Sequence, residues 1–174
     1  NKVSTIEHLM AALWTSGVDN AVVEIDAPET PIMDGSAREY AAKIAEAGLE
    51  EQDADIVYYE IKERVRYSIP EKGVEIEIYP DEEFSVSVHI DYNSKVLGNQ
   101  YAVYKDGDDF ASEIAPCRTF VFLHELEPLL NLNLIKGGDL DNAIVIVEKP
   151  VSDQEFTRLS EVFQKKDIKV TGGY

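Results

Sequence analysis

Two adjacent residues near the start of the chain, Glu7 and His8, carry side chains that a hydrolytic metal enzyme uses. A neutral imidazole can bind zinc, and a catalytic zinc site leaves one coordination position open for water. A carboxylate that does not bind the metal can take a proton from that water. Because adjacent helical residues diverge by about 100°, Glu7 and His8 are not expected to bind the same ion. One can bind the metal while the other accepts the proton.

Both residues also have a structural interpretation. Ser4 and Glu7 have the spacing of a capping box, in which two side chains bond backbone N–H groups at the start of a helix. His8 is equally compatible with a surface imidazole near a helix end. No HExxH pattern follows to supply a second ligand from the same helix. The spacing alone therefore leaves both interpretations open.

Other candidate residues have less support from the pattern. Cys117, the single cysteine, is interpreted as an inert core thiol because no base lies near it in sequence. His89 and His124 fall at polar positions of an expected strand and helix, which is typical of surface residues. Gly138 belongs to a glycine pair that either lets a ligand approach the backbone or supplies a turn with positive φ. Lys136 is a candidate contact for an anion, with exposure to solvent as the alternative.

The apolar pattern predicts helices around these residues. Residues 5–18 are expected to form a helix with one buried stripe, and residues 21–26 a strand buried on both faces. A turn at 32–36 leads to a second helix over 37–47, with Ser36 as its cap and Gly48 at its end. The stripe of the first helix comprises Ile6, Leu9, Met10, Leu13, Trp14 and Val18.

After a polar stretch at 50–55 the apolar period changes from 3.6 to 2 residues. This predicts half-buried antiparallel strands over 56–92, joined by turns that contain Pro and Gly. The remaining pattern predicts a mixture of helices and strands, and hence an α+β fold of sheets layered against helices. We expect two domains, at 1–52 and 56–174. The later elements are expected at 108–115 (helix), 118–122 (strand), 123–132 (helix), 143–148 (strand) and 152–165 (helix).

Composition limits the partners. The 174 residues carry 34 acidic and 16 basic side chains, a net charge of −18, and 44% of the residues are hydrophobic. The apolar content favours a folded protein, whereas the charge repels nucleic acid and anionic lipid within a Debye length of about 8–10 Å. No apolar run approaches the ~20 residues of a membrane span. We expect no nucleic-acid binding, no stable membrane insertion and, with a single cysteine, a reducing cytoplasmic location.

Five blocks that span nearly the whole chain resemble one known family. They are residues 4–13 (STIEHLMAAL), 17–20 (GVDN), 31–37 (PIMDGSA), 115–120 (APCRTF) and 136–143 (KGGDLDNA). In this order they resemble the zinc-dependent UDP-3-O-acyl-N-acetylglucosamine deacetylases of lipid A biosynthesis in Gram-negative bacteria. The resemblance implies a two-domain deacetylase fold, Zn²⁺ as cofactor, and a UDP-sugar carrying an acyl chain as substrate. The implied reaction is hydrolytic removal of the 2-N-acetyl group, the committed step of that biosynthesis.

The resemblance also implies roles for single residues. Glu7 is similar to the family's general base, and His8 to one zinc ligand. Thr119 is similar to the threonine that hydrogen-bonds the oxyanion, and Asp34 to an aspartate that supports a catalytic histidine. The segment from about 121 to 150 resembles a βαβ insert that forms an acyl-chain passage. The implied substrate-binding positions are Phe120, Leu126, Ile135, Lys136, Gly138, Ala143 and Val145.

Measured against the family pattern, this chain holds one of three zinc ligands. The others, on a His-Lys-x-x-Asp helix, and the general-acid histidine fall beyond residue 174. We therefore expect an internal fragment: 1–52 as the second half of the N-terminal domain and 56–174 as most of the C-terminal domain. Since three protein ligands fix a catalytic zinc site, we predict that these residues alone are inactive. In some bacteria the family forms the first half of a fusion with a hydroxyacyl-carrier-protein dehydratase, which is compatible with this sequence.

Two alternatives remain open from the sequence. One is a related zinc amidohydrolase that uses the same scaffold on another substrate. The other is a non-catalytic, acidic α+β binding module that keeps the sequence pattern but has lost the metal.

Overall fold

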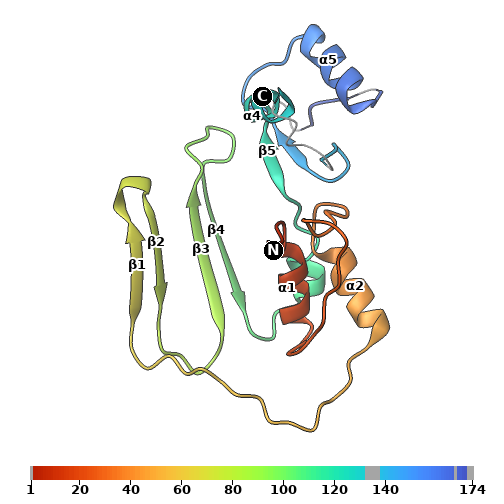
Figure 1. Cartoon of the computed structure of the whole chain (residues 1–174). Coiled ribbons are helices and arrows are strands. Elements are labelled where there is room, and N and C mark those ends of the chain that lie inside the picture. The colour runs from red at the N-terminus through yellow and green to blue at the C-terminus, as the bar shows by residue number, and fades with distance from the viewer. Residues whose placement is uncertain (1, 132–137, 167, 172–174) are drawn as a thin grey trace. The chain divides into compact units, whose positions relative to one another are not determined.

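The structure is a computed structural model that describes residues 2–131, 138–166 and 168–171 (Figure 1). Contacts group the chain into two compact units. The first comprises Asn1–Leu49, Asp91–Asn99 and Asp109–Tyr174, and the second Glu50–Ile90 and Gln100–Asp108. The chain's mixture of helices and small sheets agrees with the expected α+β class. The expected two domains, 1–52 and 56–174, stay a prediction.

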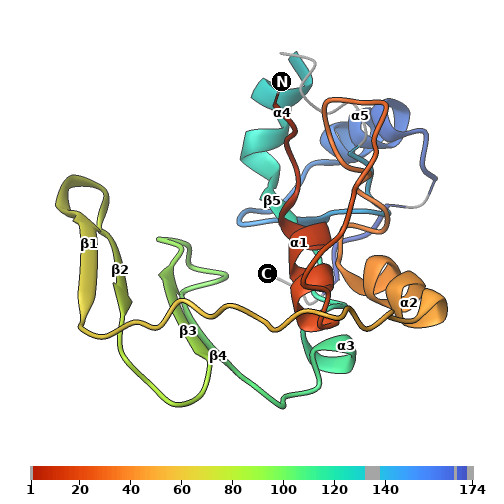
Figure 2. The same ribbon diagram turned by 60° about the horizontal axis from the view of Figure 1, so that its bottom comes forward.

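Three helices of the first unit pack through small side chains. They are α1 (Glu7–Thr15), α2 (Arg38–Ala47) and α3 (Phe110–Glu113), which lie side by side in both ribbon views (Figure 2). Alanine has no side chain beyond Cβ, so helices that meet through alanines approach closely. Larger apolar side chains then pack around this contact. The buried residues are Ala12, Ala37, Ala41 and Ala115, with Tyr40, Ile44 and Phe110 packed against them.

The helix expected over 5–18 forms, but its predicted start and buried face are wrong. Its N-cap is Ile6, which makes no side-chain cap bond. Ser4 cannot close a capping box because its backbone pairs with residues 28–30: its N–H donates to Pro28 O at 2.9 Å, and its carbonyl accepts from Thr30 N at 3.2 Å. None of the predicted stripe is buried: Ile6, Met10 and Trp14 are exposed, the other three residues are half-buried, and α1 is buried through Ala12 instead.

Two predicted strands are not formed. Residues 21–26 and 56–61 have no strand pairing, and Val22 and Val57 keep 91% and 94% of their surface. An extended segment becomes a strand only when another strand satisfies its backbone N–H and C=O groups. The described residues place no such partner beside either segment. The alternating side chains at 56–61 therefore remain exposed.

The C-terminal part of the first unit contains a parallel strand pair joined by a helix. β5 (Phe120–Phe122) pairs in parallel with β6 (Ile144–Ile146), and α4 (Leu123–Asn131) follows β5 directly (Figure 1). α5 (Asp153–Phe163) begins with a capping box in which Ser152 and Glu155 bond each other's backbone N–H groups. These elements match the helices and strands predicted there.

Among the described residues, no helix has both the length and the apolar character needed to cross a bilayer.

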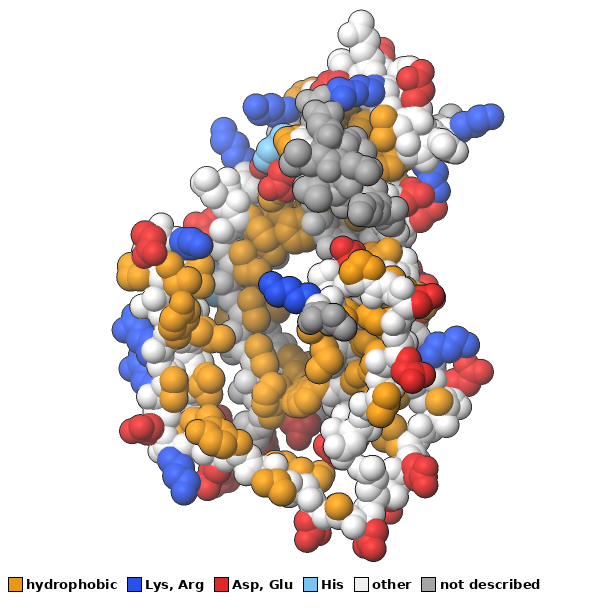
Figure 3. Space-filling model, viewed as in Figure 1, with side chains coloured by type: hydrophobic (Ala, Val, Ile, Leu, Met, Phe, Trp, Pro, Cys, Tyr) orange, Lys and Arg blue, Asp and Glu red, His pale blue; other side chains and the backbone are white. Residues whose placement is uncertain are grey.

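The second unit is built on two hairpins. β1 (Val65–Ile69) and β2 (Val74–Ile78) are antiparallel and joined by η1 (Pro70–Lys72), while β3 (Ser85–Asp91) pairs with β4 (Asn99–Lys105). The β1–β2 register puts apolar pairs such as Tyr67 and Ile76 on one face. These side chains are exposed (Figure 3), whereas half-burial was predicted. The opposite face carries charge: Glu77 accepts a hydrogen bond from Arg64, which lowers the pKa of its carboxyl.

One glycine permits a backbone contact between distant segments of the first unit. Gly35 has φ +82°, and a Cβ built on it would lie 1.8 Å from the carbonyl oxygen of Asn142. Both the left-handed conformation and the missing side chain are therefore needed. The turn at 32–36 can lie against the loop before β6 only with glycine at this position.

We predict that Gly35→Ala destabilises the fold strongly. The left-handed conformation costs about 1–2 kcal/mol for an L-residue, and displacing the Asn142 backbone raises the total loss to roughly 2–5 kcal/mol. Gly17→Ala is the matched control, because Gly17 has φ +74° but its Cβ would make only an ordinary 3.8 Å contact with Leu49. Urea unfolding of both variants measures the difference. Equal losses would contradict the close-approach argument.

Candidate active site

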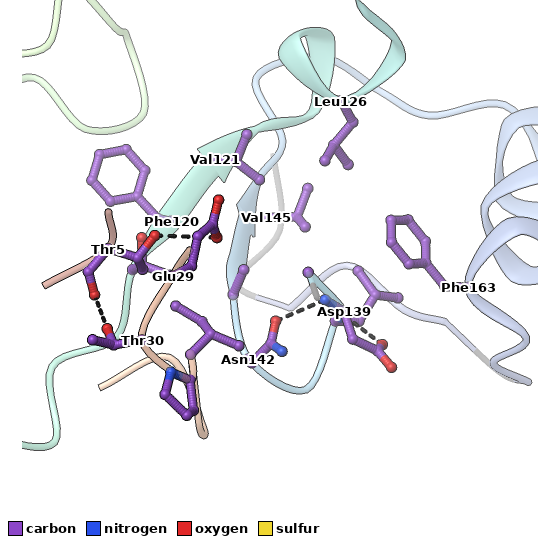
Figure 4. A pocket seen from close by; sticks show the side chains of 16 residues that line it. Thr5, Glu29, Thr30, Phe120, Val121, Leu126, Asp139, Asn142, Val145 and Phe163 are labelled. Carbon is purple, nitrogen blue, oxygen red and sulfur yellow. Dashed lines mark hydrogen bonds between the residues drawn. The ribbon is translucent and has the colours of Figure 1, made fainter. Parts of the chain in front are cut away.

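The first unit contains a pocket of about 520 Å³, a size within the roughly 300–1,000 Å³ of small-molecule sites. Its wall combines the loop around Thr30, the strand β5, the helix α4, the segment 138–145 and the end of α5 (Figure 4). Segments more than a hundred residues apart thus meet around one space.

The two ends of the pocket differ in polarity. Thr5, Glu29 and Thr30 lie together at one end, beside Phe120 (Figure 4). At the other end, the apolar side chains of Leu126 from α4, Val145 from β6 and Phe163 from α5 point toward the same space, with the polar residues Asp139 and Asn142 at its edge. Leu126 is nearly buried, at 4% exposure. The pocket can therefore take a ligand that is polar at one end and apolar at the other.

The structure brings together most of the predicted substrate-binding residues. On the pocket wall are Thr119, Phe120, Leu126, Gly138, Ala143 and Val145. Three other predicted residues, Glu7, His8 and Asp34, are not on this wall. Ile135 and Lys136 lie outside the described residues. The roles assigned to all of them stay predictions.

Thr119 is held by two backbone hydrogen bonds. Its N–H donates to Gly35 O at 2.8 Å, and its carbonyl accepts from Ile144 N at 2.9 Å. The first bond joins it to the turn at 32–36 and the second to β6. Phe120, the next residue, packs edge-to-face on Tyr92 with a centroid distance of 5.4 Å. Backbone and ring contacts thus fix this stretch of the pocket wall.

Thr5 adopts a conformation that β-branched residues rarely take. Its φ is +58°, and such backbone strain costs on the order of 1–3 kcal/mol. The hydroxyl of Thr30, a buried residue, donates to the Thr5 carbonyl. The Thr5 hydroxyl in turn donates to Glu29 Oε2 at 3.4 Å. These contacts hold the chain in place immediately before the turn of α1 that carries Glu7 and His8.

Glu7 and His8 occupy the first turn of α1. Glu7 is exposed and His8 is half-buried. Among the residues that the structure describes, no group of three His, Cys, Asp or Glu side chains is placed to hold a metal ion. His8 is therefore a single ligand candidate, and the described residues do not fit a complete zinc site.

Both carboxylate oxygens of Asp34 accept hydrogen bonds in the turn at 32–36. Its Oδ1 accepts from the Ser36 hydroxyl at 2.6 Å and the Ser36 N–H at 3.2 Å, and its Oδ2 accepts from Arg38 at 2.5 Å. The Ser36 hydroxyl, helped by the Arg38 charge, lowers the pKa of Asp34. Its backbone carbonyl accepts from Arg118 Nε at 2.8 Å. Asp34 thus holds the turn at 32–36 and ties it to the segment before β5.

Sequence reasoning missed several residues of the site. Thr5, Glu29 and Phe163 lie on the pocket wall, but the sequence analysis gave none of them a role there. The apolar face of its helix could have identified Phe163 as a buried residue, whereas no local sequence signal predicts the positive φ of Thr5. Cys117 is exposed, so its interpretation as a core thiol is wrong. Its neighbours form the short turn after α3, which leaves the thiol at the surface.

Comparison with known proteins gives one consistent family. The family model described as UDP-3-O-acyl N-acetylglycosamine deacetylase (LpxC) matches residues 1–168. The Bifunctional enzyme LpxC/FabZ of Porphyromonas gingivalis is 49% identical over 172 residues, covering 98% of this chain and 37% of that protein. The UDP-3-O-acyl-N-acetylglucosamine deacetylase of Teredinibacter turnerae is 40% identical over 170 residues, covering 96% and 55%. The chain thus spans about a third to a half of these relatives.

We predict that Asp34→Asn removes an acid-dependent part of the stability. Because the folded pKa lies below the ordinary value of 3.8, Asp34 stabilises the fold above that value and loses this effect as the pH falls through the folded pKa. At neutral pH the variant should lose about 1.5–3 kcal/mol, as expected for hydrogen bonds to a charged group. Below pH 3.8 the stability of the two proteins should converge.

Thermal unfolding of the native protein and the Asp34→Asn variant between neutral and acid pH measures this effect. Asp109→Asn is a comparison at another carboxylate, which caps α3 through Ser112 and whose pKa is also lowered, so it should show an acid-dependent loss of its own. A stability difference for Asp34→Asn that stays constant with pH would show that its charge does not hold the turn.

Proposed function

This chain belongs to the UDP-3-O-acyl N-acetylglycosamine deacetylase family, and on that premise we propose that the whole protein, at the length of its relatives, removes the N-acetyl group from UDP-3-O-acyl-N-acetylglucosamine in lipid A biosynthesis. One observation carries the proposal: the pocket has a polar end beside the segment that leads into Glu7 and His8, and an apolar end opposite. The proposed substrate likewise combines a polar sugar amide with an acyl chain.

The polar end suits attack of water on an amide. We assign Glu7 as the base that takes the proton from the attacking water. The Thr119 hydroxyl is assigned as a donor to the oxyanion that forms on the amide carbonyl, because a donor fixed beforehand is worth most where charge develops. The backbone bonds of Thr119 to Gly35 and Ile144 support this role.

The apolar end suits the acyl chain. Each methylene that leaves water gains about 0.8 kcal/mol, and the wall here is made of Leu126, Val145 and Phe163. Phe120, Gly138 and Ala143 complete the assigned passage, and small side chains at the last two positions leave room for a chain. Ile135 and Lys136 keep their assignment as substrate-binding residues on the family resemblance alone.

Zinc dependence is part of the proposal, with His8 as one ligand. The described residues do not complete a zinc site, so we assign no step to the metal. For the same reason we expect the 174 residues by themselves to be inactive. Asp34 keeps its assignment as a residue that supports the site, through the turn that it holds together.

Two relatives are named as bifunctional LpxC/FabZ enzymes: the one from Porphyromonas gingivalis described above and one from Bacteroides thetaiotaomicron. The second is 47% identical over 161 residues, covering 92% of this chain and 35% of that protein. We extend the proposal accordingly: the whole protein carries a hydroxyacyl-carrier-protein dehydratase fused to the deacetylase and works in the cytoplasm.

We predict that Glu7→Ala in the whole protein lowers kcat by roughly 10²–10⁴-fold, the usual effect of losing a general base, while the zinc content is kept. Release of acetate from the UDP-sugar measures kcat. Glu39→Ala is the matched control, since Glu39 is also an exposed carboxylate in the first turn of a helix. Unchanged turnover in Glu7→Ala would contradict the assignment.

We predict that His8→Ala lowers the zinc content instead, measured by elemental analysis of the purified whole protein. His89→Ala, at an exposed position of β3, should keep the metal. Equal zinc content in native protein and His8→Ala would remove His8 from the ligand set. A native protein with neither zinc nor turnover would favour the acidic binding module.

A further inference from the structure

The end of α5 forms part of the apolar end of the pocket. Phe163 is the last residue of α5 and the pocket-lining residue that this helix contributes. Its half-buried ring points into the space shared with Leu126 and Val145 (Figure 4). It lies opposite the polar end formed by Thr5 and Thr30. A chain that enters from the polar end would therefore extend toward this ring.

A sharp turn directly after Phe163 makes neighbouring side chains point to different places. Gln164 has φ +52°, a left-handed conformation that is uncommon for a residue with a side chain. The turn is closed by Lys165 N, which donates to Ser160 O at 3.0 Å. Because of this turn, Phe163 faces the pocket while Lys165 reaches the loop before β6.

Lys165 fastens the end of α5 to that loop. Its ammonium forms ion pairs with Asp141 and, at 3.6 Å, with Asp139. Asp139 is itself a pocket-lining residue, and its N–H donates to Asn142 Oδ1 at 2.7 Å. The hydrogen bond to Asp141 raises the pKa of Lys165, so the amine stays charged throughout the neutral range. Ion pairs of Lys165 thus join the end of α5 to the pocket wall at Asp139.

We propose that Phe163 determines the length of the acyl chain that the pocket accepts, and that Lys165 positions it through Asp139 and Asp141. This inference rests on the proposed function, because it takes the acyl chain as the occupant of the apolar end. The physical argument is steric. An aromatic ring is rigid and ends the apolar space, so carbons beyond it gain no burial. Each methylene that finds room inside the pocket raises affinity about threefold to fourfold.

The test changes the size of residue 163 in both directions in the whole protein. Phe163→Ala should shift the preferred chain to longer members of a series of saturated fatty acids, and Phe163→Trp to shorter ones. Between chains that differ by two carbons, the affinity ratio should change by about tenfold, the value of two buried methylenes. Calorimetry measures the binding, and kcat/KM for UDP-sugars with the same acyl chains gives a parallel series.

Phe156→Ala is the matched control, since Phe156 is a half-buried phenylalanine of α5 that does not line the pocket. It should keep the native chain-length preference even if it weakens the helix. Opposite shifts for the smaller and larger residue support the inference, because a loosened helix would not shift the preference both ways. Native preference in both Phe163 variants overturns it.

Fatty-acid binding needs no turnover, so the two proposals can fail separately. If the native protein deacetylates no UDP-sugar but Phe163→Ala still shifts the fatty-acid preference, the proposed function fails and Phe163 keeps its role. If deacetylation is normal and the preference is unmoved in both variants, the role of Phe163 fails alone.

The positioning role of Lys165 has its own test. Lys165→Gln should broaden the chain-length profile toward that of Phe163→Ala, whereas Lys166→Gln, at an exposed neighbouring position, should leave it unchanged. Asp141→Lys should broaden it as well, and combining it with Lys165→Asp should restore it. High salt should broaden the native profile, because partly exposed ion pairs are screened. A native profile in Lys165→Gln would show that Lys165 does not position Phe163.

Discussion

The backbone contact between Gly35 and Asn142 is the constraint on which the pocket depends. It brings a turn at the start of the chain against a loop more than a hundred residues later, at a distance that no side chain at position 35 would permit. The Gly35 carbonyl accepts from Thr119, whose own carbonyl accepts from Ile144. One short stretch of backbone thereby joins the turn, β5 and β6. Thr119, Phe120 and Val145 of the pocket wall lie on the segments joined by these bonds.

The polar end contains local backbone strain, and hydrogen bonds offset its cost. Thr5 occupies a left-handed conformation, and Thr30, Glu29 and Ser4 supply the hydrogen bonds that keep it there. Strained residues persist where the surroundings over-determine them, and they concentrate at functional sites. Here the strained residue lines the pocket and comes just before the turn of α1 that holds Glu7 and His8. This placement supports the assignment of that turn to the chemistry.

Charge acts locally in a protein whose net charge is −18. Arg38 with Asp34, and Lys165 with Asp139 and Asp141, each connect a helix end to a loop of the site. Exposed ion pairs add little to stability, so their value here is in fixing position.

The sequence by itself determined the family, the helices and strands after residue 107, and the candidate pairing of Glu7 with His8, because ordered motifs and strong periodicity are local properties. It missed β4 (Asn99–Lys105). It failed at residues 21–26 and 56–61, where the pattern is that of a strand but pairing depends on a distant partner. Only the tertiary structure decided that Ser4 pairs with Glu29 rather than capping α1, and that Thr5 is strained. It also decided that Phe163 lines the pocket. These outcomes depend on contacts between segments far apart in the chain, and no spacing along the sequence encodes such distances.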